Sequence, residues 1–420
     1  MALSRIADSA ERFVYRIAGL PVAVWAIFAG SDSESTDPLQ TAFVWRYWHP
    51  DDLGEWSQLL SAVIAWPIAI LLASAWYTWR NGGIIRRRHG KGRSLQFLEQ
   101  LRLYFSVGVL APWYYVFSLH DDGASRAPTF IQRFETKRYY FPLLKPQKGT
   151  PLNDKGRFAD YCNEHGIRCV ETLMCLQGED PHRALPERDL FVKPTKGRGG
   201  RGTERWDHVG PSRFTGPNGK QLDGGDLLAR LVRRSRREPL IIQPRLNAHP
   251  GLVSLTAGAL PTIRILTCLN EKHEPEVMAA MLRTSFGKNI TVDNLHAGGI
   301  GALVDLELGA LSQSSNIGSD ARLGWFSVHP DTHAPIEGRI VPRWGQVKAQ
   351  AIAAHRWFDD RVVVGWDIAV LENGPIFIEG NGNPDLDILQ RFMRIGLREH
   401  RFAELLAHHI RSRGSEGRQS

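Results

Sequence analysis

The chain lacks the cysteine patterns of disulfide-rich and zinc-binding proteins. Its 420 residues include four cysteines, Cys162, Cys169, Cys175 and Cys268, with no CxxC pair and no histidine at zinc-ligand spacing. We therefore expect reduced thiols, which are typical of a catalytic portion in the cytosol. Internal repeats and long low-complexity segments are also absent from the sequence.

Several nucleotide-binding and nucleophile motifs are missing as well. The sequence contains no GxxxxGK[ST] phosphate loop, no serine elbow and no kinase catalytic loop. A GxGxxG pattern does occur at residues 197–202, but residues 203–207 after it resemble a strand, whereas a dinucleotide fingerprint opens a helix. We therefore exclude dinucleotide binding at this loop.

The overall composition is that of a globular protein longer than one average domain. Apolar residues make up 43%, charged residues 23%, and the net charge is +8. Five arginines between residues 230 and 237 indicate a basic helix face, which we interpret as a solvated or membrane-facing surface. Because no interleaved aromatic platform accompanies it, nucleic-acid binding is not expected.

Residues 1–80 differ from the rest and predict a helical membrane anchor. Residues 56–79 contain no charge and are long enough for a bilayer, and a basic cluster follows at residues 80–93. A shorter run, residues 17–30, indicates a second helix of a hairpin; a buried helix pair in a soluble domain is the alternative. The expected location is a bacterial-type inner membrane with the chain after residue 80 in the cytoplasm, or else the cytoplasm alone.

The remaining chain shows a sequence of distinct segments. Residues 81–150 form a basic, aromatic juxtamembrane region, in which residues 103–119 fit an interfacial or core segment. From residue 151 the pattern alternates between helix and strand. We predict helices over 153–165 and 388–411, strands at 190–192, 240–243, 262–268, 277–282, 362–364, 368–371 and 376–379, and a disordered tail over 412–420.

A glycine-rich loop follows the strand predicted at residues 190–192. The strand ends in Lys193, and the loop contains Gly197, Gly199, Gly200 and Gly202. Glycine allows backbone N–H groups to close over a polyphosphate, and Lys193 offers a compact cation for a phosphate oxygen. A solvated basic turn is the alternative interpretation.

A hairpin with polar ends is predicted near the C-terminus. Asp367 lies on its first strand, Glu379 and Asn381 end its second strand, and residues 372–374 form the turn. Two carboxylates and an amide oxygen are hard ligands that suit Mg²⁺ rather than zinc or copper. A structural ion pair with nearby arginines is the alternative.

The order of these motifs resembles that of ATP-grasp enzymes. Lys155 in NDK, VKP with the glycine loop, IIQPRL and the D…E-x-N hairpin follow one another between residues 150 and 395. The segment MLRTSFGKNITVDNLHAGGIGALVD is similar to the sugar-transfer-associated branch, which is related to alpha-L-glutamate ligases. The resemblance implies an α+β fold with two subdomains clasping ATP, at residues 151–250 and 251–411.

The resemblance also implies a role for each candidate site residue. Lys155 and Lys193 would contact the α- and β-phosphates, and the glycine loop would be a lid. Mg²⁺, as two ions and with Mn²⁺ as an alternative, would bind Asp367, Glu379 and Asn381. The remaining positions are an adenine hinge whose backbone pairs with the base (Gln243, Arg245, Leu246), two arginines facing the γ-phosphate or acyl substrate (Arg264, Arg283), and Asn294 with Gly298 and Gly299 near the phosphates.

The implied activity is ligation of a carboxylate to an amine through an acyl phosphate. The substrate would be a small molecule or a glycan, such as an envelope polysaccharide or its precursor. A phosphotransferase and a non-catalytic ATP-binding scaffold are the alternatives. Pro384 is followed by Asp385, where glutamate ligases of this superfamily usually have glycine. This acid argues against glutamate as the transferred group, because it would repel a carboxylate or recruit an amine.

Overall fold

The computed structural model describes residues 39, 52–144, 146, 149–152, 154–179, 183–197, 200–287 and 291–416. The chain forms two compact units. The first comprises Met1–Lys145, Ile317–Gly324 and Asp385–Ser420, and the second comprises Pro146–Asn316 and Trp325–Pro384. The run at residues 17–30, which the sequence suggests as a membrane helix, lies outside the described residues.

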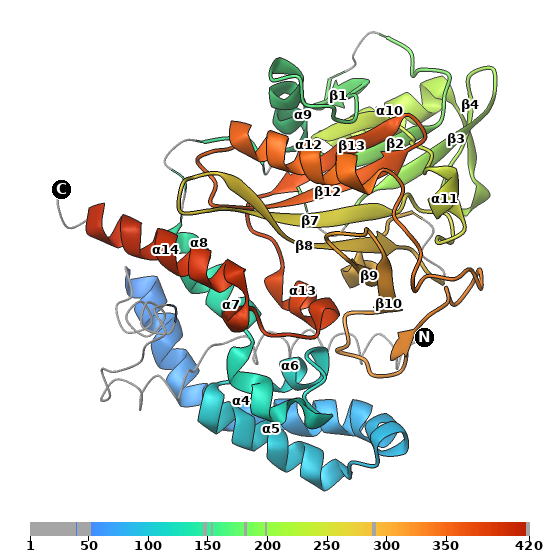
Figure 1. Cartoon of the computed structure of the whole chain (residues 1–420). Helices are drawn as coiled ribbons and strands as arrows, with labels where there is room; N and C mark the ends of the chain where they lie inside the picture. The colour runs from blue at the N-terminus through green and yellow to red at the C-terminus, as the bar shows by residue number, and fades with distance from the viewer. Residues whose placement is uncertain are drawn as a thin grey trace. The chain divides into compact units, whose positions relative to one another are not determined.

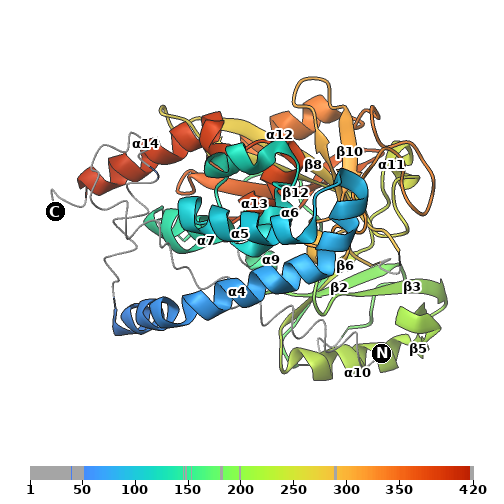
Figure 2. The ribbon, with the colours of Figure 1, turned by 90° about the horizontal axis from the view of Figure 1, so that it is seen from below.

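Helices make up the described secondary structure of the first unit. α4 and α5 follow one another through a three-residue connection and pack side by side (Figures 1 and 2). The elements are α4 (Leu53–His89), α5 (Arg93–Val107), α6 (Ala111–Val116), η1 (Asp122–Thr129), α7 (Arg133–Glu135), η2 (Thr136–Tyr140), α8 (Phe141–Leu143), α13 (Leu386–Met393), η5 (Leu397–Glu399) and α14 (Arg401–Glu416).

The predicted membrane span is not supported. Residues 56–79 belong to α4, a helix of 37 residues, but no helix is long and apolar enough to cross a membrane within the part of the chain that the structure describes. The face of α4 against α5 is also partly polar: Gln100 Nε2 donates to Thr78 Oγ1 at 2.7 Å, and Gln96 Nε2 donates to the Gly82 carbonyl at 3.1 Å. The expected inner-membrane location is likewise not supported by the described residues.

Residues 103–119 are a core segment, as one of the two interpretations expected. α5 ends at Gly108, whose φ of +72° is left-handed, and α6 begins with Pro112 in its first turn. All six residues of α6 are buried.

The helix predicted over 388–411 is instead two helices, α13 and α14, and residues 412–416 of the predicted tail continue α14.

The second unit contains two antiparallel sheets. The larger has the strand order β11-β10-β9-β8-β7-β12-β13, and α12 packs against it (Figure 1). Its core includes Ile263, Ile265, Trp366 and Phe358, which are all fully buried. The elements are β7 (Thr262–Leu269), β8 (Pro275–Thr284), β9 (Ile300–Val304), β10 (Leu311–Ser315), β11 (Trp325–Phe326), α12 (Trp344–Trp357), β12 (Val363–Leu371) and β13 (Gly374–Asn381).

The smaller sheet has the strand order β1-β6-β2-β3-β4-β5. Trp206 from its strands and Leu227 and Leu231 from α10 form its core. Its elements are β1 (Met174–Leu176), β2 (Leu190–Pro194), β3 (Glu204–Gly210), β4 (Arg213–Thr215), η3 (Pro217–Gly219), β5 (Gln221–Asp223), α10 (Gly224–Ser235) and β6 (Leu240–Pro244). The other elements of the second unit are α9 (Lys155–Glu164), α11 (Pro250–Val253) and η4 (Leu295–Ala297), and α9 and α11 pack into the core of the larger sheet.

Most strands predicted from alternating apolar residues are present. β2, β6, β7, β8 and β13 each contain a predicted strand, and the two predicted at 362–364 and 368–371 are parts of one strand, β12. The helix expected at 153–165 is α9. The four cysteines are free thiols.

Candidate functional site

The β12–β13 hairpin aligns the predicted oxygen ligands. Asp367 lies directly opposite Glu379, and Gly365 lies opposite Asn381. The register shifts between Asp367 and Ile368, which is a local irregularity of the kind that re-aims side chains. Asn381 Nδ2 donates to the Gly365 carbonyl at 3.2 Å, which leaves the amide oxygen as the acceptor of that side chain. The hairpin therefore brings all three candidate ligands together.

Two arginines bind the Asp367 carboxylate. β7 pairs with β12 so that Arg264 lies opposite Asp367, and its Nε and Nη2 both donate to the carboxylate, the latter at 2.9 Å. Arg283 on β8 places Nη2 at 2.9 Å from Asp367 Oδ2. Burial alone would raise the pKa of Asp367, but the two guanidiniums hold it well below its usual range. Asp367 is therefore ionised at neutral pH.

Asp293 joins this network and was not anticipated from the sequence. Arg283 Nε lies 3.4 Å from Asp293 Oδ2, Arg283 Nη2 donates to Thr262 Oγ1 at 2.7 Å, and Thr262 also bonds to Asp293. Burial raises the pKa of Asp293, and Arg283 opposes the rise. Its position directly before Asn294 in VDN is the only sequence signal, and it does not reveal the contact with a strand arginine.

The two predicted lysines lie near the same carboxylates. Lys193 on β2 is buried, and burial lowers its pKa to about 8, although the Glu379 and Asp367 carboxylates raise it in part. Lys155 begins α9, which Asp154 caps by accepting from the Gly156 N–H at 3.1 Å. Lys155 Nζ lies 3.8 Å from Glu379 Oε2. Cationic groups from the smaller sheet (Lys193) and from α9 (Lys155) thus lie near the hairpin of the larger sheet.

The glycine loop connects β2 to the returning strand β3, as expected. Gly197, Gly200 and Gly202 have φ values of +134°, +71° and +71°, which L side chains adopt with strain. A Cβ on Gly200 would lie 2.8 Å from Val292 Cγ1, so the loop packs closely on the segment before Asn294. Lys155 Nζ donates to the Gly197 carbonyl at 3.1 Å. Gly199 lies outside the described residues.

A cavity of about 320 Å³ lies beside Lys193. Its size and mostly apolar lining suit a flat, small ligand group. Asp293 and Thr262 bring polar groups to the same cavity. The apolar part of its wall includes Val170, Phe191, Leu246, Leu260, Val292 and Ile378.

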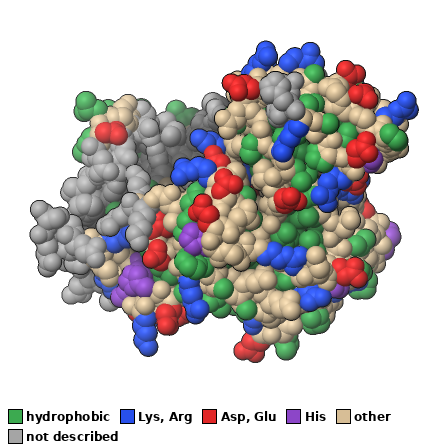
Figure 3. Space-filling view, turned by 90° about the horizontal axis from the view of Figure 1, so that it is seen from above, with side chains coloured by type: hydrophobic (Ala, Val, Ile, Leu, Met, Phe, Trp, Pro, Cys, Tyr) green, Lys and Arg blue, Asp and Glu red, His purple; other side chains and the backbone are tan. Residues whose placement is uncertain are grey.

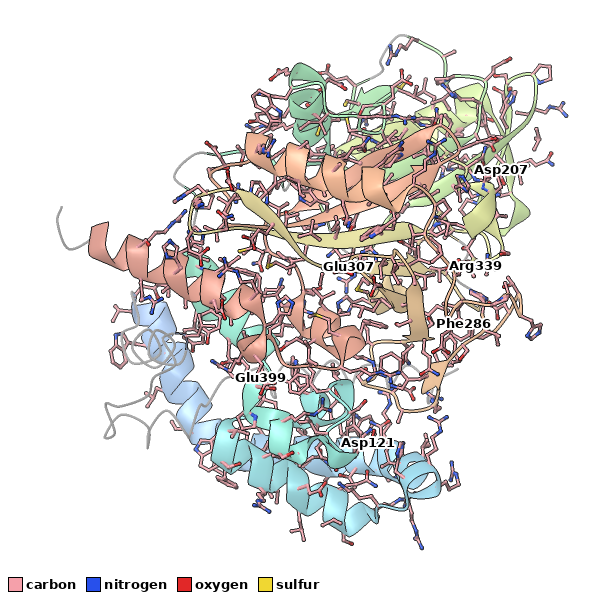
Figure 4. All side chains as sticks on the ribbon, in the orientation of Figure 1. Asp121, Asp207, Phe286, Glu307, Arg339 and Glu399 are labelled. Carbon is pink, nitrogen blue, oxygen red and sulfur yellow. The ribbon has the colours of Figure 1, made fainter. Side chains whose placement is uncertain are left out.

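The three residues of the predicted adenine hinge lie together at this cavity, and their role in binding adenine stays a prediction. Gln243, Arg245 and Leu246 all line the cavity. However, the Arg245 backbone N–H donates to the Asp189 carbonyl at 3.0 Å, so it is not available to pair with a base as expected. The Arg245 guanidinium binds Asp189 at 3.2 Å and Asp207 at 2.7 Å; Asp207 on β3 is labelled in Figure 4.

Asn294 serves a local turn in the structure. Its side-chain oxygen accepts from the His296 N–H at 2.8 Å and caps η4, which ends at Gly298 with a φ of +93°. A Cβ on Gly299 would lie 2.5 Å from the Asp293 carbonyl, so this position requires glycine. The role of Asn294 near the phosphates stays a prediction.

Asp385, expected beside a substrate loop, is paired. It accepts from Lys137 Nζ at 3.0 Å and lies 3.3 Å from Arg133 Nη2, both within the first unit. The expectation that this acid repels a carboxylate or recruits an amine is therefore weakened, because its charge is already compensated.

The basic face of α10 is also partly compensated. Arg230 and Arg234 bind Glu204 on β3 at 2.7 Å and 3.0 Å. Figure 3 shows blue and red side chains interspersed on the face in view. The two ion pairs suit a solvated surface, which is one of the two interpretations given for this face, and they do not test the membrane-facing one.

The residues at the hairpin fit a hard cation. Asp367, Glu379 and Asn381 offer oxygen atoms alone, which are the donors that Mg²⁺ prefers. Since Arg264 and Arg283 already donate to Asp367, Glu379 and Asn381 offer the more accessible oxygens. Among the charged groups of the hairpin network, the four cations Lys155, Lys193, Arg264 and Arg283 stand against the three carboxylates Asp293, Asp367 and Glu379, which favours an anionic ligand.

Known proteins resemble this chain at two levels. D-cycloserine synthetase is 16% identical, with a TM-score of 0.36, over 62% of this chain and 70% of its own. D-alanine–D-alanine ligase from Bacillus anthracis is 12% identical, with a TM-score of 0.36, over 63% and 68%. These values do not establish a shared activity, and no curated protein sequence matches the chain. The profile of the sugar-transfer associated ATP-grasp family, however, matches residues 135–403. The chain belongs to this family and has the ATP-grasp α+β fold.

Proposed function

We propose that the chain is an ATP-dependent ligase that joins a carboxylate to an amine through an acyl phosphate. The observation that carries the proposal is the position of Lys193. This buried cation lines an apolar cavity and also lies within electrostatic reach of Asp367 and Glu379. A nucleoside triphosphate has groups in the same order: a flat base for the apolar cavity, phosphates for Lys193, and a phosphate-bound metal ion for the carboxylates.

The adenine base would occupy the cavity beside Gln243 and Leu246. Its phosphates would then extend past Lys193 toward Lys155, whose ammonium already contacts the glycine loop. Backbone N–H groups of that loop would close over the phosphates, since the positive φ of Gly197, Gly200 and Gly202 directs the backbone in ways other residues rarely allow.

Glu379 and Asn381, with Asp367, would hold Mg²⁺; two ions are proposed, with Mn²⁺ as an alternative occupant. When bound, the metal neutralises phosphate charge and draws phosphate oxygens into position. Glu379 is less buried than Asp367 and already faces Lys155, so it lies where protein, metal and phosphate charges would meet. Asn381 is oriented for this role by its bond to the Gly365 carbonyl.

Arg264 and Arg283 would orient the acyl group. The substrate carboxylate oxygen attacks the γ-phosphorus, ADP leaves, and an acyl phosphate forms. The amine then attacks the acyl carbon, phosphate leaves with the C–O electron pair, and the amine loses a proton. A planar guanidinium suits a substrate carboxylate or the transferring phosphoryl group, and both arginines are held at the hairpin by their contacts with the Asp367 carboxylate.

The lid would exclude water from the acyl phosphate. Water competes with the amine and would hydrolyse this intermediate. Close packing of Gly200 on Val292 places the loop against the segment that also carries Asp293.

The acceptor is proposed as an envelope glycan or its precursor, since the name of the family associates its members with sugar transfer.

Mg²⁺-dependent ADP release by the purified full chain tests the proposal. Pooled amino acids and pooled envelope sugar precursors would be added separately and together. Release that needs both an acid and an amine supports ligation, and it should disappear in Glu379→Gln. Glu372→Gln makes the same change at an exposed turn of the same hairpin and should retain activity.

Two outcomes would contradict the proposal. ADP formed with a stable phosphorylated product, and no new C–N bond, would indicate a phosphotransferase. Tight ATP binding with no turnover in any pool would indicate a binding scaffold.

A further inference from the structure

Three side chains converge in the first unit, away from every motif used above. His89 is the last residue of α4, and His120 and Asp121 precede η1. Asp121 Oδ1 lies 2.7 Å from His89 Nδ1 and 3.0 Å from His120 Nδ1. Ligand atoms of all three residues lie within 4.8 Å of one another. Asp121 is labelled in Figure 4.

The backbone around the cluster is fixed by neighbouring contacts. The Gly90 N–H donates to the Arg86 carbonyl at 3.0 Å and ends α4 directly after His89. Arg88 donates to the Ala321 and Arg322 carbonyls at 2.6 Å each. These contacts hold the end of α4, and hence the start of the His89 side chain, in one position.

His120 is held by aromatic rings. Its side chain is 7% exposed, and its ring centroid lies 6.1 Å from those of Tyr114 and Tyr115. The Leu119 N–H donates to the Tyr114 carbonyl at 2.9 Å, which closes the turn before it. A buried, oriented imidazole loses little conformational freedom on binding an ion, so the cluster is preorganised.

Nearby charges allow a cation at this place. Three arginines, Arg86, Arg87 and Arg88, precede His89 in the last turn of α4, and Arg88 donates to two backbone carbonyls. Lys91 follows His89 and acts electrostatically on Asp121, but both Glu99 oxygens lie 2.9 Å from its Nζ. Glu99 also accepts from the Tyr114 hydroxyl at 2.6 Å. The carbonyl end of α4 carries a partial negative charge, which favours a cation near His89.

We propose that His89, His120 and Asp121 bind a divalent transition-metal ion of the Zn²⁺ type. Two imidazoles and a carboxylate suit borderline ions and not Mg²⁺. Ligand atoms about 2.1 Å from a tetrahedral ion are about 3.4 Å apart, so the Asp121–His89 separation of 2.7 Å and the Asp121–His120 separation of 3.0 Å would widen by about 0.7 Å and about 0.4 Å on binding.

The fourth position of this site faces solvent. The His89 and Asp121 side chains are 37% and 45% exposed, so water or a small anion can complete the coordination. The ion would connect the end of α4 to the segment between α6 and η1. Its two histidine ligands, His89 and His120, are 31 residues apart in the sequence. Binding to the folded state alone stabilises it by mass action.

The test is a Zn²⁺ titration of the full chain in excess Mg²⁺, read by competition with a chelating indicator. We expect one ion per chain, and Co²⁺ in its place should give the visible absorption of a low-symmetry, imidazole-bound ion. His89→Ala and Asp121→Asn each remove one exposed ligand and should weaken Zn²⁺ binding by at least about 100-fold. Zn²⁺ should raise the unfolding temperature of the unchanged chain and not of these variants.

His408→Ala is the matched control, since it removes one partly exposed imidazole from α14 in the same unit. It should leave the one-to-one Zn²⁺ site intact. Binding that is equally tight in His89→Ala, Asp121→Asn and the unchanged chain would overturn the proposal. The proposal would also be overturned if the unchanged chain did not bind one Zn²⁺ ion more tightly than His89→Ala and Asp121→Asn do.

Discussion

The hairpin cluster of the second unit and the histidine cluster of the first unit both centre on an aspartate, but their surroundings differ. Asp367 is 4% exposed and is bound by Arg264 and Arg283, whereas Asp121 is 45% exposed and faces two imidazoles. Guanidiniums that stay charged at neutral pH surround the buried carboxylate, so this site suits an anionic ligand that binds together with a hard metal ion such as Mg²⁺. Two imidazoles beside a more exposed carboxylate form a set of ligands that suits a single softer ion. The identity of the neighbours, rather than the carboxylate, decides which ligand each cluster fits.

Glu379→Gln should give the largest effect and separate the two clusters. Loss of one charged ligand at the phosphates is expected to reduce Mg²⁺-dependent ATP turnover by about 10²–10³-fold, as for other groups that stabilise developing charge. Zn²⁺ binding at His89, His120 and Asp121 should not change, and His89→Ala should leave ATP affinity unaltered. Steady-state ADP release and Zn²⁺ titration of both variants measure this. If either variant lost both its function with ATP and its Zn²⁺ binding, the two clusters would not be independent sites.

Lys193→Met should weaken ATP binding by about 10–100-fold, because a charge-assisted contact contributes roughly 1.5–3 kcal/mol. Met retains most of the apolar stem, so the fold should persist. Lys196→Met makes the same change at an exposed position three residues along the chain and should have little effect. Calorimetric titration with ATP distinguishes the two. Equal loss in both variants would mean that general charge attraction, and not the buried position, determines affinity.

The pH dependence of kcat/KM for ATP should report the same lysine. Burial lowers the pKa of Lys193 to about 8, so the side chain is cationic below this pH and becomes neutral above it. Since kcat/KM follows the free enzyme, it should fall by up to about tenfold per pH unit above pH 8. Lys193→Arg keeps its charge and should show a flatter profile in this range. A profile that is the same in both proteins would assign the titration to another group.

Local patterns in the sequence predicted the parts of the site that depend on neighbouring residues. Apolar runs on either side of the turn predicted at residues 372–374 bring Asp367 close to the end of the second strand of a hairpin, and a strand ending in Lys-Pro places Lys193 before the glycine loop. Pairings between distant segments were not predictable in this way. Arg283 with Asp293 and Asp385 with Lys137 depend on tertiary packing, which no spacing in the chain encodes.

The same limit explains two other differences. The uncharged run at residues 56–79 fits a span by composition, but composition does not show that Thr78 accepts a hydrogen bond from Gln100 on a following helix. His89 and His120 match no known ligand spacing, and only the fold brings them to Asp121.

Arg230→Gln should have the smallest effect and sharpen the contrast between exposed and buried cations. Arg230 binds Glu204 through two nitrogens, at 2.7 Å and 2.9 Å, and lies 5.3 Å from the centre of the Trp206 ring. Its side chain is 39% exposed, and Arg234 and the Trp206 indole N–H, each at 3.0 Å, still satisfy Glu204 after the change. The loss of stability should therefore be about 1 kcal/mol or less, read as a small shift of the urea midpoint. Arg233→Gln, at an exposed position of the same helix, should shift it less. Because neither arginine faces the nucleotide cavity, ATP affinity should stay constant in both; a tenfold loss in Arg230→Gln alone would extend the nucleotide site to α10.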